Sequence, residues 1–231
     1  LSCYNFPIMF DYIDVHSHVN FVAFDADRDE TVKRALDSGV YMINVGTQVD
    51  TSKKAIEMAE KYDKGVYAII GLHPVHTDKS FHDEKELGEG GKEFTSRGEV
   101  FDENAYRDMA KHPKVVGIGE CGLDYYRLEL ESERKQREAF SSQIDVANES
   151  GKPLMLHVRN GSDKSAYRDA LAILKSEAKV RGDFHFFAGS WDEAKEILDA
   201  GFNLSFTGVI TFARNYDEVV KNVPLDRIMS E

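Results

Sequence analysis

Short apolar segments alternate with amphipathic segments along the whole chain, and this alternation is the strongest constraint on its fold. Most of the apolar segments are rich in β-branched or aromatic residues, which is typical of strands buried on both faces of a parallel sheet. The expected strands are residues 12–16, 40–45, 66–71, 115–119, 153–158, 183–187, 202–206 and 227–230.

The amphipathic segments predict helices between these strands. They cover residues 28–38, 51–63, 132–150, 164–179, 191–200 and the region near 215–222. Ser190 and Glu193 have the spacing of a capping box, and glycine follows several helices as a C-cap residue does. Strand–helix alternation implies right-handed βαβ units. Eight strands indicate an α/β fold, a (β/α)8 TIM barrel, as a single domain over residues 1–231. No dinucleotide or P-loop glycine motif supports a doubly wound sheet instead.

Segments outside this pattern carry weaker signals. Residues 78–104 are polar and rich in glycine, which predicts a loop insertion after the third strand, with a surface loop favoured over a lid. Residues 1–8 lack a starting Met, so we expect the true start at Met9.

The apolar runs are too short for a membrane span, and two cysteines do not make a disulfide framework, so we expect a cytoplasmic protein. A formal net charge of -12 argues against a broad basic surface for nucleic acid.

Five of the eight histidines lie at or just beyond the C-terminal ends of predicted strands. These are His16, His18, His73, His157 and His185. The C-terminal rim of a barrel is where such folds place their active sites. His16 and His18 are two residues apart in a strand, so they point to the same face. The remaining three, at positions 76, 82 and 112, are expected to be ordinary surface residues.

Glu120 follows the fourth predicted strand, where an unpaired buried charge is costly and a metal ion would compensate it. Together with His16, His18, His157 and His185 it makes five N/O ligands on one rim, a set that suits Zn²⁺, Mn²⁺, Fe²⁺ or Co²⁺. A single histidine at a strand end is usually a hydrogen-bonded core residue. Five in register with a glutamate favour metal binding. The neighbouring Cys121 is expected only to pack.

Six motifs occur in order over nearly the whole chain: "DVHSH" (14–18), "GLHP" (71–74), "GIGECGLDYY" (117–126), "LHVR" (156–159), "HFFAGS" (185–190) and "LSFTGVITF" (204–212). Together they resemble the TatD family of metal-dependent deoxyribonucleases, which belong to the amidohydrolase-like barrels. The first motif alone indicates only a metallohydrolase.

The resemblance implies two divalent metal ions, Mg, Mn or Zn. His16 and His18 would bind the first ion, His157 and His185 the second, and Glu120 would bridge them. It also implies a 3′-5′ exodeoxyribonuclease in which a metal-activated hydroxide cleaves phosphodiester bonds of DNA, preferably at single-stranded or frayed ends. No membrane and no obligate protein partner are implied.

The same resemblance makes His73 and Arg159, with Glu120, candidate catalytic residues that orient the phosphate. An ion pair with a rim carboxylate is an equally good interpretation of Arg159. Asp124 would contact substrate or order its loop, and loop order is favoured. Tyr125 and Tyr126 would stack on a base or pack, and packing is favoured.

The chain departs from the family at its end. The family's eighth strand finishes in Glu-Thr-Asp, whose Asp binds the first metal, whereas this sequence reads "RIMSE". We therefore expect a truncated barrel, with a short eighth strand and no eighth helix, that is less stable and binds the first metal more weakly than a completed one. Two alternatives stay open: a hydrolase of the same class acting on a small ester, lactone or amide, and a barrel that binds without turnover.

Overall fold

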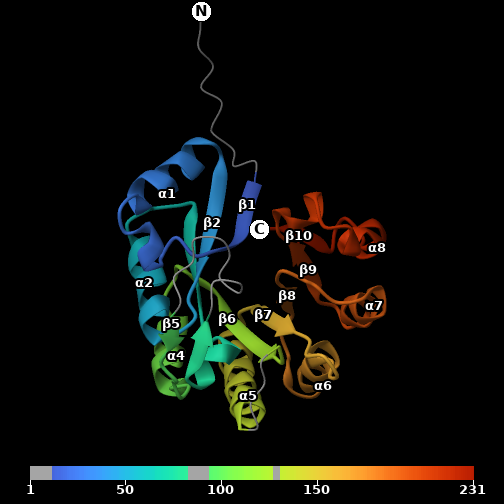
Figure 1. Cartoon of the computed structure of the whole chain (residues 1–231). Helices are drawn as coiled ribbons and strands as arrows, with labels where there is room; N and C mark the ends of the chain where they lie inside the picture. The colour runs from blue at the N-terminus through green and yellow to red at the C-terminus, as the bar shows by residue number, and fades with distance from the viewer. Residues whose placement is uncertain (1–11, 83–93, 127–130) are drawn as a thin grey trace, which may run out of the picture.

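Eight parallel strands form one sheet that curls into a nearly closed barrel (Figure 1). The computed structural model describes residues 12–82, 94–126 and 131–231. The strand order is β1-β2-β3-β6-β7-β8-β9-β10. These strands are β1 (Tyr12–Ser17), β2 (Val40–Val45), β3 (Val66–Ile70), β6 (Val115–Asp124), β7 (Leu154–Arg159), β8 (Gly182–Phe184), β9 (Asn203–Phe206) and β10 (Ile228–Ser230). The predicted TIM-barrel class is confirmed.

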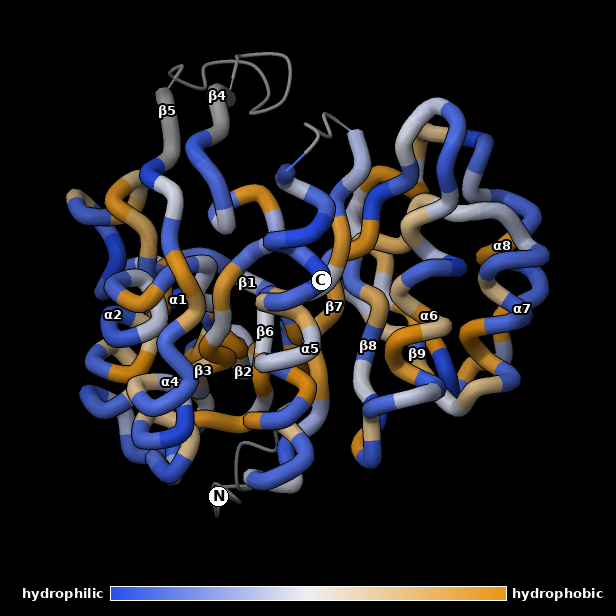
Figure 2. The backbone as a smooth tube through the Cα atoms, turned by 90° about the horizontal axis from the view of Figure 1, so that it is seen from below, coloured by the Kyte–Doolittle hydropathy of each residue, from blue (hydrophilic) through white to orange (hydrophobic). Residues whose placement is uncertain are grey.

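The helices lie on the outside of the strands (Figure 1). They are α1 (Arg28–Asp37), α2 (Val49–Glu60), α4 (Glu103–Ala110), α5 (Ser132–Ser150), α6 (Ala166–Glu177), α7 (Trp191–Asp199) and α8 (Asp217–Asn222). Figure 2 shows polar and apolar residues alternating along them, as one buried face per helix requires. The predicted capping box of Ser190 and Glu193 opens α7.

Two of the three sets of buried apolar side chains lie on opposite faces of the strands. The larger set lies between helices and strands and includes Phe140, Phe184 and Phe202, each at most 1% exposed. Burying each such side chain contributes about 1.5–3 kcal/mol. The second set, on the opposite face of the strands, centres on Ile69 and Met155. The barrel interior is therefore filled with side chains below the rim.

The predicted insertion at 78–104 contains regular structure. Strands β4 (Ser80–His82) and β5 (Phe94–Ser96) pair antiparallel, and residues 83–93 between them lie outside the described part. Asp102 caps α4 by accepting hydrogen bonds from Asn104 N and Ala105 N, so the insertion ends before residue 103. Helix α4 was not predicted, because only Tyr106 and Ala110 of its eight residues are buried.

Two strand ends differ from the prediction in ways that matter for the rim. Strand β6 continues to Asp124, so Glu120 lies within the strand. Strand β8 ends at Phe184, so His185 follows the strand. Residues 1–8 and His82 are outside the residues whose side chains the structure describes.

The first two residues of β1 carry exposed apolar side chains. Tyr12 is 69% exposed and Ile13 is 41% exposed. The apolar surface expected on the strands beside the missing helix, and the lower stability inferred from it, stay predictions. Within the described ranges, no helix combines the length and apolar character needed to span a membrane.

Candidate metal centre

The five rim histidines converge on a single buried carboxylate. Glu120 is 3% exposed, and its two oxygens face different histidines. The residues come from β1, β6 and β7 and from the segments that follow β1, β3 and β8. Parallel strands bring their C-terminal ends to one rim, which is why ligands far apart in sequence meet here.

Oxygen Oε2 of Glu120 faces the two histidines of the first motif. It lies 3.6 Å from His16 Nε2 and 3.7 Å from His18 Nε2. The two Nε2 atoms are themselves 3.1 Å apart. One ion can therefore contact both rings, as the alternating positions predicted.

Oxygen Oε1 faces the remaining three histidines. His185 Nε2 is 2.8 Å away, His157 Nδ1 is 2.9 Å away and His73 Nε2 is 3.1 Å away. His157 Nδ1 and His185 Nε2 are 3.3 Å apart. The carboxylate thus stands between two groups of histidines, in the position that a bridging ligand needs.

The outer nitrogens of the ligand histidines contact acceptors. His18 Nδ1 lies 2.9 Å from the carbonyl of Val45, and His157 Nε2 lies 2.9 Å from Asp124 Oδ2. Since a carbonyl or carboxylate oxygen only accepts, the outer nitrogens of these rings carry the proton. The inner nitrogen of a neutral His18 is then free to bind a cation, whereas His157 Nδ1, 2.9 Å from Glu120 Oε1, must first lose the proton that it donates there. Contacts of this kind normally orient metal-binding histidines.

Two buried polar atoms lack hydrogen-bond partners at the same place. They are His16 Nδ1 and Glu231 Oε2, which lie 3.9 Å apart. A cation on Nε2 would leave the proton of His16 on Nδ1, opposite that carboxylate. The orphaned atoms, the close nitrogens and the bridging carboxylate all fit a centre for divalent metal ions.

The charge states of the cluster follow from burial and from Glu120. Burial, with His185 nearby, lowers the pKa of His16 to about 4. Burial opposes charge on His185 too, but the carboxylates of Glu120 and Glu231 raise its pKa to about 10. Burial likewise opposes charge on His157, and its bonds to Asp124 and Glu120 still raise its pKa. Burial would raise the pKa of Glu120, yet the surrounding histidines hold it well below its usual range.

Metal binding should therefore release protons. At pH 7 the pKa of about 10 keeps His185 protonated, whereas His16, with a pKa of about 4, is already neutral. Loading both ions should release at least one proton, and the apparent affinity should rise from pH 6 to pH 9. Calorimetric titration with Mn²⁺ in buffers of different ionisation enthalpy measures this number. Heats independent of the buffer would contradict the assigned charges.

The predicted substrate residues lie beside the cluster. Asp124 orders its loop, since its Oδ1 accepts a hydrogen bond from Tyr126 N at 2.9 Å while Oδ2 faces His157. The guanidinium of Arg159 lies 3.6 Å from the ring centre of Tyr126. Tyr126 is 51% exposed, so the packing predicted for it is wrong, because its ring covers Arg159 and not the core. Tyr125 is buried and bonds Asp169, as expected for packing.

Glu231 is the site residue that the sequence analysis missed. Its Oε1 accepts a hydrogen bond from Phe186 N at 2.5 Å, and Oε2 lies 3.5 Å from His185 Nδ1. Its position directly after the eighth strand was the available signal. Two other expectations are met: Cys121 is fully buried, and His112 pairs with Glu60 on the surface.

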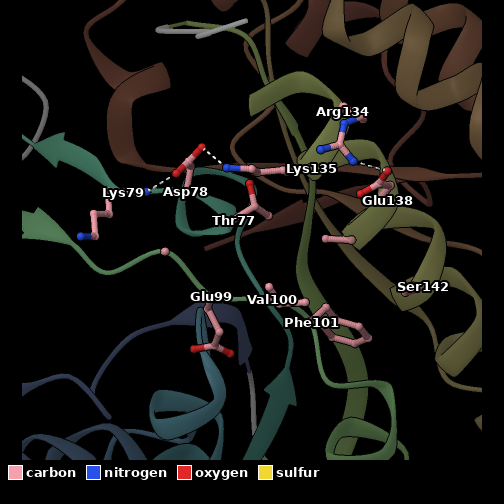
Figure 3. A pocket seen from close by; sticks show the side chains of 12 residues that line it. Thr77, Asp78, Lys79, Glu99, Val100, Phe101, Arg134, Lys135, Glu138 and Ser142 are labelled. Carbon is pink, nitrogen blue, oxygen red and sulfur yellow. Dashed lines mark hydrogen bonds and ion pairs between the residues drawn. The ribbon is translucent and has the colours of Figure 1, made fainter. Parts of the chain in front are cut away.

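A pocket of about 500 Å³ lies between the base of the insertion and helix α5 (Figure 3). Two of the cations that line it have partners, since Lys135 pairs with Asp78 at 2.5 Å and Arg134 pairs with Glu138 at 2.7 Å. These two side chains therefore add little uncompensated positive charge to the pocket.

Comparisons with known proteins agree with this geometry. A model of the family described as "TatD related DNase" matches residues 13–231. The uncharacterized metal-dependent hydrolase YabD of Bacillus subtilis is 35% identical, over 94% of this chain and 78% of YabD. The 3′-5′ ssDNA/RNA exonuclease TatD of Klebsiella pneumoniae is 32% identical, over 94% of this chain and 76% of that protein. The crystal structure of YjjV, a TatD homolog from Escherichia coli K12, has the same fold, with a TM-score of 0.73 at 24% identity over 94% of this chain and 76% of YjjV. The chain therefore belongs to the TatD family of metal-dependent hydrolases.

Proposed function

We propose that this protein hydrolyses phosphodiester bonds of single-stranded DNA from the 3′ end, with two divalent metal ions bound at the Glu120 cluster. The single observation that carries the proposal is the division of the cluster by Glu120, with His16 and His18 on Oε2 and His157 and His185 on Oε1. Support comes from relatives whose names describe 3′-5′ ssDNA/RNA exonucleases. Zn and Mn suit the imidazole-rich donor set, and Mg is the third ion that the family resemblance implies.

The residues around the cluster have separable tasks in this reaction. Bound divalent ions lower the pKa of water and offset the charge that develops on phosphate oxygens. The chain itself supplies Arg159, whose planar guanidinium matches phosphate oxygens, beside the exposed ring of Tyr126. A base stacked on that ring would leave its phosphate close to Arg159. With a net charge of -12, binding of DNA must depend on such local contacts.

The test is cleavage of a 5′-labelled single-stranded oligonucleotide by the protein loaded with Mg²⁺ or Mn²⁺. We expect products that shorten from the 3′ end, and no products with a chelator or with His157→Ala. A phosphorothioate at the 3′-terminal linkage should slow the first step. Uncleaved DNA, together with turnover of a small ester or lactone in a parallel panel, would contradict the proposal.

Replacement of Arg159 by lysine should weaken substrate binding more than it slows the chemical step. Lysine keeps the positive charge but loses the planar fork of donors and the stack on Tyr126. We expect KM for the oligonucleotide to rise about tenfold with kcat within about twofold, which marks a loss of uniform binding. Arg134→Lys on α5, an exposed residue paired with Glu138, is the matched control and should change neither constant. Equal constants for Arg159→Lys and wild type would remove Arg159 from the site.

A further inference from the structure

A single hydrogen bond in the loop after β3 fixes the proton of His73. His73 is the N-cap residue of the short 3-10 helix Pro74–Thr77, and its Nδ1 accepts from Val75 N at 3.2 Å. A ring nitrogen that accepts an N–H bond carries no proton. The proton of the neutral imidazole therefore lies on Nε2.

That nitrogen faces the bridging carboxylate. His73 Nε2 is 3.1 Å from Glu120 Oε1, the same oxygen that faces His157 and His185. By distance alone, His73 joins Glu120 and His157 as a third ligand. A protonated Nε2 has no lone pair for a metal ion, so the local backbone contact decides against that interpretation.

His73 differs from His18 and His157 in which ring nitrogen carries the proton. The outer nitrogens of His18 and His157 donate to oxygen, so a cation can bind the inner nitrogen of each ring once that nitrogen carries no proton. The outer nitrogen of His73 accepts instead, which leaves its inner nitrogen as a donor. The histidines that face Glu120 therefore differ. His73 presents an N–H donor to the carboxylate, whereas His18 and His157 present the nitrogen that can bind a cation.

The chain contains the same arrangement a second time, away from the metal centre. His112, two residues after α4, accepts from Lys114 N at 3.2 Å through Nδ1. Its Nε2 lies 3.0 Å from Glu60 Oε1 on the surface. His112 therefore serves as an internal reference for a histidine whose backbone contact makes it a donor to glutamate.

We propose that His73 is a fixed hydrogen-bond donor to Glu120 and not a third ligand beside His157. It is a positioning residue, which holds the orientation of the bridging carboxylate through its Nε2–H. The inference rests on the metal centre of the proposed function but not on its substrate, because the measurements below need no DNA.

The direct test is the protonation of the imidazole nitrogens in ¹⁵N-labelled protein, with and without Zn²⁺, by long-range ¹H–¹⁵N correlation. His73→Asn assigns the signals by their disappearance. We expect His73 to show the Nε2–H form in both states, with the same pattern as His112, while Nδ1 of His157 shifts on zinc binding. A zinc-shifted Nε2 at His73 would overturn the inference.

Two substitutions supply an independent readout. His73→Asn retains an oxygen that can accept from Val75 N but loses the donor to Glu120, whereas His73→Gln can extend an amide N–H toward Glu120. Both should bind as many zinc ions per chain as wild type. The Asn variant should bind them about tenfold more weakly, and the Gln variant should recover most of that loss. His157→Gln is the matched ligand control and should lose one ion.

Each failure has its own meaning. Loss of an ion by His73→Asn, equal to that of His157→Gln, makes His73 a ligand and overturns the inference. A wild-type protein that binds no zinc overturns the inference together with the metal centre. A loaded protein that leaves DNA intact overturns only the proposed substrate.

Discussion

Replacement of Glu120 by glutamine should abolish both metal sites at once. Glutamine has nearly the same size but lacks the negative charge that faces His16 and His18 on one side and His157 and His185 on the other. We expect bound Zn²⁺ or Mn²⁺ to fall to background in the purified protein. Because the ions contribute several kcal/mol to the transition state, DNA cleavage should fall by about 10³-fold or more.

Metal content by elemental analysis and a single-turnover cleavage assay measure this result. Glu99→Gln is the matched control, since Glu99 is another rim glutamate, with its side chain 14% exposed, whose oxygens bond Val49 N and Gln48 and not the histidines. That variant should keep its metal. If Glu120→Gln retained one ion per chain, the bridging role would be wrong and a single-metal centre would replace it.

The barrel and the meeting of most candidate ligands at its rim could be predicted because they depend on local patterns. Apolar runs followed by His or Glu identify strand ends, and parallel strands bring those ends together. The convergence of His16, His157 and His185 on Glu120 follows from this without further information. Helix α4 was missed because it is short and has only two buried residues, so its periodicity is weak.

The orientation of each ring could not be predicted, because it depends on partners that are distant in sequence or placed by a particular turn. His18 is oriented by a carbonyl 27 residues away, and His157 by a carboxylate 33 residues away. The proton position of His73 follows from a turn whose geometry the sequence "GLHP" does not specify. The set of side chains that meet at the rim is therefore available from sequence, while the choice between donor and ligand needs coordinates.

Gly122→Ala should cause a large loss of stability beside the site. Gly122 has φ of 139°, which L side chains rarely adopt, and an added Cβ would lie 2.1 Å from the carbonyl oxygen of His157. Relieving that contact must move β7 away from β6 or deform the strand. The backbone strain and the displaced packing should together cost about 4 kcal/mol, a drop in Tm of roughly 8–16 °C.

Gly151→Ala separates the two causes. Gly151 ends α5 with φ of 68°, and an added Cβ there meets nothing within 4 Å. That variant should therefore show only the left-handed backbone cost of about 1–2 kcal/mol, with Zn²⁺ binding unchanged. Gly122→Ala should in addition weaken Zn²⁺ binding, because the peptide that it displaces belongs to His157. Equal Tm losses for the two variants would mean that β6 and β7 can separate at no cost, and that the position of His157 does not depend on their close approach.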